Sequence, residues 1–227
     1  MKRSIILIAL ALVVILAICG CSEKKADPPA TTSPGSQTAA GDAAEEATSD
    51  PNITINKAKK QVTVVAEVNG KYFTEGTKHA VSYKDGGNGE KSLLRSQGSQ
   101  LVFHQALIDL GFKPGDNVKL EDMDKGVKNT GDQLDVFVSW DGKEVPFADV
   151  FEASEERPID IRFAGNIEAA KEKNAGCLLC FDSCAVGITT NAAYETGASN
   201  TIKFNGKSDV LPADGTTVKV IFRARAN

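Results

Sequence analysis

The sequence predicts a single α+β domain that is predominantly antiparallel β-sheet, a sandwich or a half-open barrel, with one or two short helices. From residue 52 onward, apolar and polar residues alternate in several stretches, as expected for sheet with one face on a core. Helical spacing of apolar residues is confined to two short segments. The 227-residue chain is 41% hydrophobic and 25% charged, so it can form a packed core.

The alternation predicts strands over residues 62–68, 134–140, 159–163 and 218–223, and a further strand is expected from His79 to Tyr83. Asn69-Gly70 and Asp141-Gly142 are residue pairs that favour tight hairpin turns. We therefore expect two hairpins, one after the first strand and one after the strand that ends at Trp140.

The firmer helix is predicted over residues 100–110. Ser99 can cap its start and Gly111 can end it. Its apolar stripe consists of Val102, Phe103, Ala106, Leu107 and Leu110. A second helix is expected from Ile167 to Lys173, with Asn166 as its cap.

The N-terminus has the pattern of an export signal. Lys2-Arg3 precedes an apolar run over residues 5–18, which is too short to span a bilayer comfortably. The run ends in Ile18-Cys19-Gly20-Cys21, which resembles a bacterial lipobox. The resemblance implies cleavage before Cys21 and lipidation of its thiol. An uncleaved anchor is the alternative, and Cys19 is a poorer acceptor because bulky Ile18 would stand at the cut.

Residues 22–51 are rich in small, polar and acidic residues and contain no aromatic residue. Such a segment buries too little apolar surface to offset its ordering entropy, so we expect a flexible tether that spans on the order of 30 Å. The predicted organisation is a signal peptide over 1–20, a lipid anchor and tether over 21–51, and a domain over 52–227. The protein is thus expected on the extracytoplasmic face of the cell membrane, attached to it through lipid.

Charge and composition exclude a nucleic-acid-binding protein. The net charge is −4, no basic run is present, and aromatic residues make up only 6% of the chain. A positive footprint and aromatic stacking platforms are therefore both missing.

The concentrated chemistry of the sequence lies in Cys177, Cys180 and Cys184, spaced C-x2-C-x3-C. These cysteines match the last three of the four in a bacterial ferredoxin motif, which favours an iron–sulfur cluster. Asn174 stands where the first cysteine is required, and Ala185 replaces the usual proline. The n-region also lacks a twin-arginine signal for the export of a folded cofactor protein.

Two other uses of the thiols stay open. Outside the cytoplasm, Cys184 could form a disulfide with Cys177 or Cys180, leaving one reactive or inert thiol. Alternatively the cysteines could bind zinc or another ion, with His79 or His104 as the fourth ligand.

Several features, in order along the chain, resemble the YdjY-like domain family. They are His79, the strand from Lys91 to Arg95, the segment His104–Gly115, the strand ending in Phe163-Ala164-Gly165, and the run Gly176–Asn191. The resemblance covers roughly Val62 to Arg223. It implies a small exported or lipid-anchored bacterial protein, and members are sometimes described as ferredoxin-like because of the cysteine run.

The sequence therefore favours a non-enzymatic lipoprotein, with an accessory or binding domain that carries a structural or redox-sensitive cysteine loop. The alternative is an iron–sulfur electron-transfer protein that serves a membrane redox complex. No recognisable catalytic motif is present to argue for an enzyme.

Overall fold

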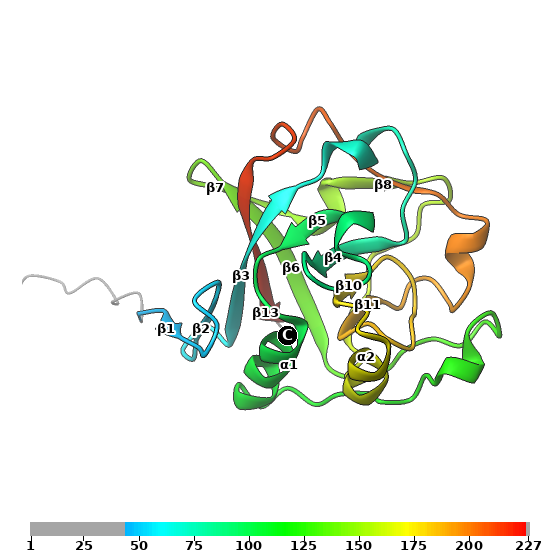
Figure 1. Cartoon of the computed structure of the whole chain (residues 1–227), viewed down its shortest axis with the longest axis horizontal. Helices are drawn as coiled ribbons and strands as arrows, with labels where there is room; N and C mark the ends of the chain where they lie inside the picture. The colour runs from blue at the N-terminus through cyan, green and yellow to red at the C-terminus, as the bar shows by residue number, and fades with distance from the viewer. Residues whose placement is uncertain (1–43, 226–227) are drawn as a thin grey trace, which may run out of the picture. The chain divides into compact units, whose positions relative to one another are not determined.

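A computed structural model describes residues 44–225 of the chain (Figure 1). In these residues it contains two α-helices, α1 (Gln100–Asp109) and α2 (Ile167–Lys173). The strands are β1 (Glu46–Ala47), β2 (Ile53–Asn56), β3 (Gln61–Val68), β4 (His79–Tyr83), β5 (Ser92–Ser96), β6 (Gln133–Trp140), β7 (Lys143–Pro146), β8 (Phe151–Ala153), β9 (Ile161–Phe163), β10 (Cys177–Cys180), β11 (Thr189–Asn191), β12 (Phe204–Gly206) and β13 (Thr217–Ala224). Short 3₁₀ turns join several of them.

Eight strands close into a barrel in the order β3-β13-β6-β9-β11-β10-β4-β5. The barrel closes because the second half of β3 pairs with β5, in the register Ala66↔Ser96 to Val68↔Leu94. The first half of the same edge pairs with β2, which lies outside the barrel order. Two pairs of adjacent strands in the ring, β4–β5 and β10–β11, run parallel. The other pairs in the ring, including β10–β4 between them, are antiparallel.

The predicted fold class is therefore wrong in two respects. The sheet is closed rather than a sandwich or half-open barrel, and it is mixed rather than predominantly antiparallel in its site-bearing half. Alternation along a strand reports only that one face is buried. It carries no information on the direction of the neighbouring strand, nor on whether the last strand returns to the first.

Of the two predicted hairpins, one forms and the other does not. Asp141-Gly142 does turn β6 into β7, with Trp140 opposite Lys143, as predicted. The Asn69-Gly70 prediction is wrong, because the chain continues there into a 3₁₀ turn over Gly70–Phe73. The Asn69 amide instead donates to the carbonyl of Ser92, which tethers the end of β3 to the start of β5.

Both predicted helices are confirmed. The Ser99 hydroxyl accepts a hydrogen bond from the Leu101 amide and so caps α1. Phe103 of α1 packs on Phe222 of β13, and His104 packs on Phe163 of β9. Since the helix also contacts β3 and β10, it lies across one end of the barrel (Figure 1).

A small second sheet pairs β8 with β12. Aromatic side chains stack there and contact Phe181, the residue that follows β10. The Phe181 and Phe204 rings are 5.0 Å apart and nearly parallel. This packing fixes the end of the cysteine-bearing strand.

The predicted signal sequence and the lipid-acceptor Cys21 lie outside the described residues. Within residues 44–225, no helix combines the length and the apolar character needed to cross a bilayer. The last residues of the predicted tether include β1, which pairs with β2.

Candidate metal and thiol site

Strand β10 presents its two cysteines on one face because its pairing with β4 is irregular. In a regular strand, residues three apart point to opposite faces. Here Cys177 is opposite Ser82, Leu179 opposite Val81, and Cys180 opposite His79, with register shifts between them. Such a bulge re-aims side chains. As a result Leu178 and Leu179 enter the main hydrophobic core, while both cysteines belong to a second, separate cluster.

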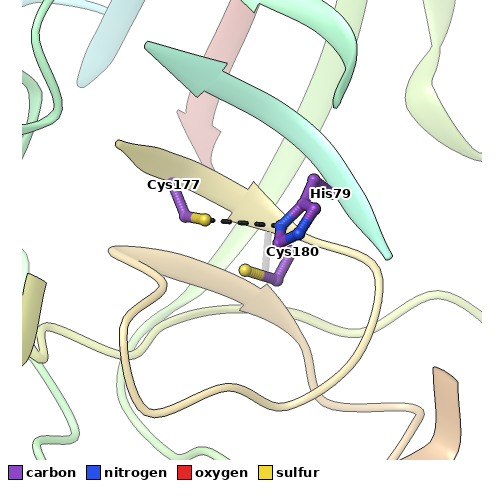
Figure 2. Close-up of side chains that lie close together, drawn as sticks. All are labelled: His79, Cys177 and Cys180. Atoms are coloured by element: carbon purple, nitrogen blue, oxygen red, sulfur yellow. Dashed lines mark hydrogen bonds between the residues drawn. The ribbon is translucent and has the colours of Figure 1, made fainter. Parts of the chain in front are cut away.

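His79 completes this cluster from the neighbouring strand. It is the first residue of β4, its backbone amide donates to the Thr77 hydroxyl, and its ring is buried. Its Nδ1 lies 3.5 Å from the Cys177 Sγ (Figure 2). The ligand atoms of His79, Cys177 and Cys180 all lie within 4.8 Å of one another.

Cys177 is the sulfur best placed to ionise. Its pKa lies well below the ordinary thiol value, chiefly because the Cys180 thiol hydrogen-bonds to it, and also because His79 and Asn88 face it. The Asn88 amide is 3.5 Å from the sulfur and the Ser82 hydroxyl 3.8 Å. These contacts outweigh burial, which acts in the opposite direction.

Cys180 has the opposite tendency. Its pKa is raised because its hydrogen bonds to Cys177 and Cys184 favour the protonated thiol, and because it is buried. The two sulfurs therefore share protons as a pair, in which Cys177 loses its proton first.

Cys184 lies on the segment between β10 and β11, residues 181–188, and is held by two buried amides. The Asn129 carboxamide oxygen accepts from the Cys184 backbone N–H at 2.8 Å. The Asn166 side-chain amide donates to the Cys184 carbonyl at 2.8 Å. Gly187 lets this segment approach the site, since a Cβ there would lie 3.0 Å from the Cys180 Sγ.

The site opens to solvent through a cavity of about 490 Å³. His79, Cys180 and Cys184 line it, whereas Cys177 does not and has no exposed surface. Residues 175–185 are all buried. A small ligand or ion would therefore approach past Cys180 and Cys184, with Cys177 behind them.

Of the two histidines considered as a fourth ligand, only His79 is close to the cysteines. His104 lies on α1, with its ring 5.4 Å from that of Phe163, and does not belong to the cluster of ligand atoms. The three cysteines are free thiols in the structure.

Sequence reasoning missed the amides around the thiols: Asn88, Asn129 and Asn166. Asn88 reaches Cys177 because its loop packs directly on the turn before β10, where a Cβ on Gly86 would lie 2.6 Å from the Gly176 Cα. The glycine-rich run that contains Asn88 was an available signal, although glycines in such loops are common. Asn166 was predicted as a helix cap, but its side chain makes no capping hydrogen bond and reaches Cys184 instead.

Comparison with known proteins gives a consistent family. The YdjY domain model matches residues 53–223. The chain is 39% identical over 176 residues to the "Uncharacterized protein YdjY" of Escherichia coli (strain K12), covering 75% of this chain and 78% of that protein. No solved structure matches significantly. The chain belongs to the YdjY domain family.

Proposed function

We propose that this protein is a membrane-anchored, extracytoplasmic lipoprotein whose YdjY domain serves as an accessory binding domain for one thiophilic metal ion. His79, Cys177 and Cys180 supply the first ligands, and Cys184, whose side chain interacts with the Cys180 thiol, is a further donor. The lipoprotein part rests on the lipobox-like sequence before Cys21. The metal part rests on the geometry of the site.

One observation carries the metal assignment: the 3.5 Å separation between the Cys177 Sγ and the His79 Nδ1. Two ligands of one tetrahedral ion, at ordinary metal–sulfur and metal–nitrogen bond lengths, lie roughly 3.5–3.8 Å apart. All three ligand atoms lie within 4.8 Å of one another, so a small adjustment of side chains suffices to bring them around one centre. A bound cation would also neutralise a Cys177 thiolate, whose charge is costly to bury.

The neighbouring groups suit such a role. Asn88 and Ser82 contact the Cys177 sulfur, and Asn129 and Asn166 fix the backbone of Cys184. Partners of this kind orient the metal ligands, and losing one commonly lowers metal affinity by about 10- to 100-fold.

An iron–sulfur electron carrier is the second candidate, favoured by the C-x2-C-x3-C spacing. In the [4Fe–4S] cluster of bacterial ferredoxins each cysteine binds a different iron, so the sulfurs are separated by the width of the cluster. Cys177 and Cys180 are closer together than that arrangement requires, since their sulfurs fall within the 4.8 Å group. Geometry therefore favours a single ion over a [4Fe–4S] cluster.

The test is metal analysis of the full chain, purified in detergent without air. We expect about one equivalent of a thiophilic metal per chain, and sulfur-to-metal charge-transfer bands when Co²⁺ is added. Cys180→Ser should abolish both. His104→Gln should retain both, because His104 lies away from the thiols.

The alternatives give different results. A brown protein whose visible absorbance disappears in Cys180→Ser would establish the iron–sulfur candidate in place of a single ion. A colourless, metal-free chain that resists loading and contains one reducible disulfide would instead show that the cysteine loop is bracing or redox-sensitive.

A further inference from the structure

The sulfur atoms of residues 44–225 are gathered in one place. The four sulfur-containing side chains there are Cys177, Cys180, Cys184 and Met123. The three cysteines form a buried cluster, and Met123 packs against it from a distant part of the sequence. Nothing in the barrel core requires this, because the main core is built from aliphatic and aromatic residues.

Met123 lies at the mouth of the site. It follows the 3₁₀ turn Leu120–Asp122, is half-buried, and lines the same cavity as Cys180 and Cys184. Its Sδ accepts the backbone N–H of Ala185 at 3.4 Å, which holds the thioether beside the residue that follows Cys184. A thioether sulfur has two lone pairs, so the second remains available to a metal ion.

Two carboxylates also line the cavity, and each accepts a hydrogen bond. The Asp182 carboxylate accepts the Ser199 N–H at 3.0 Å, and the Asp124 carboxylate accepts the Asn200 side-chain amide at 2.8 Å. The cavity wall also includes the exposed lysines Lys78 and Lys91. These lysines balance the formal charges of Asp124 and Asp182 in the same lining, so the donor atoms rather than the net charge decide which ion binds.

We propose that this site selects the soft monovalent ion Cu(I), with the Met123 thioether as a ligand at its cavity-facing side. Thiolate and thioether donors together favour Cu(I), whereas zinc sites are built from cysteine, histidine and carboxylate ligands. This inference rests on the proposed metal-binding function and specifies which ion the site takes. The ion binds as Cu(I), so no electron transfer accompanies its uptake.

Competition for metal tests the inference. The full chain in detergent, kept without air, is titrated against a chromogenic Cu(I) chelator and, separately, against a fluorescent Zn²⁺ chelator. We expect the chain to withdraw Cu(I) from its chelator. Met123→Leu, which keeps the side-chain volume, should weaken Cu(I) binding by about 10-fold or more and leave Zn²⁺ binding unchanged.

Leu120→Ala is the matched control, because Leu120 lines the same cavity but carries no donor atom. It should leave Cu(I) binding as in the unmodified chain. Thermal unfolding followed by circular dichroism checks that both variants are folded. X-ray absorption at the copper edge of the unmodified chain gives a readout independent of any variant, and should show a shell dominated by sulfur.

Failure of this inference is distinguishable from failure of the metal-binding proposal. If Zn²⁺ binds more tightly than Cu(I), or if Met123→Leu binds Cu(I) as the unmodified chain does, the copper assignment is wrong while metal binding stands. If neither ion binds, the proposed function itself is wrong, and the copper assignment with it.

Discussion

At the scale of single residues, the two histidines of the chain have different surroundings. His79 faces thiols, whereas His104 lies on α1 against Phe163. Burial lowers the pKa of His104 below its ordinary value of 6.5, and Lys171 adds to this, while Asp116 and Glu168 act in the opposite direction. His104 is therefore a packing residue that resists protonation.

This pKa shift predicts a pH-dependent stability. Because the folded pKa is the lower one, the unfolded chain binds more protons just below pH 6.5, so the stabilisation is present above that value and is lost as the pH falls through the folded pKa. Urea unfolding at about pH 7.5 and about pH 5.5 should show a smaller loss of unfolding free energy in His104→Gln than in the unmodified chain. The difference should be modest, since the ring is partly solvated. An equal loss in both proteins would contradict the assignment.

At the scale of elements, the segment 181–188 joins two neighbouring parallel strands, β10 and β11. Such a segment must return to the start of the next strand, which brings it back across the cysteines. The backbone N–H and C=O groups of this buried segment need hydrogen-bond partners. The Asn129 side-chain oxygen provides one of them, for the Cys184 N–H. The Asn129 oxygen also accepts from the Thr190 hydroxyl at 3.1 Å, so one side chain ties the loop to β11.

Asn129→Ala should therefore destabilise the domain. It removes the acceptor of a buried backbone N–H and of a buried hydroxyl, which we expect to lower the free energy of unfolding by about 1–3 kcal/mol. Asn117→Ala is the matched control, because Asn117 accepts the Thr130 N–H but is exposed. Urea denaturation of the metal-free chains measures both changes. If the two variants lose the same stability, Asn129 has no special structural role.

The same element shows what the sequence could predict. The spacing of Cys177 and Cys180 indicated a shared site, and the structure does bring their sulfurs together with His79. The bulge that makes this possible depends on pairing with β4, nearly a hundred residues earlier in the chain. Similarly, Asn129 and Met123 approach the thiols only through the fold, since neither belongs to a local motif with the cysteines.

At the scale of the whole molecule, both helices and the strands β3, β4, β6, β9 and β13 were predictable because each depends on local periodicity or capping, whereas the short strands β8, β10, β11 and β12 were not predicted. Closure was not, because it depends on β3 sharing one edge between β2 and β5. Leu94 illustrates the point. It is fully buried and pairs with Val68 across the closing edge and with Val81 in the parallel pair, and no local pattern specifies both neighbours.

The proposed attachment to the membrane also concerns the whole molecule. If Cys21 carries the lipid, Cys21→Ser should move the protein from the membrane fraction to the soluble fraction. The variant has no thiol to carry lipid, and stable anchoring needs more than one acyl chain. Cys19→Ser is the matched control and should remain in the membrane fraction. Fractionation followed by immunoblotting, with labelling by a radioactive fatty acid, measures both. Retention of a Cys21→Ser chain in the membrane fraction would instead support an uncleaved signal anchor.

The complete burial of Cys177 has a kinetic consequence. Cys180 and Cys184 border the cavity, but the Cys177 sulfur is buried against His79, Ser82 and Asn88. An ion held there would exchange in steps, first releasing the outer sulfurs and only then the inner one. Its residence time would follow the rate at which these neighbouring groups move aside, so the domain would act as a slow store rather than a rapidly equilibrating buffer.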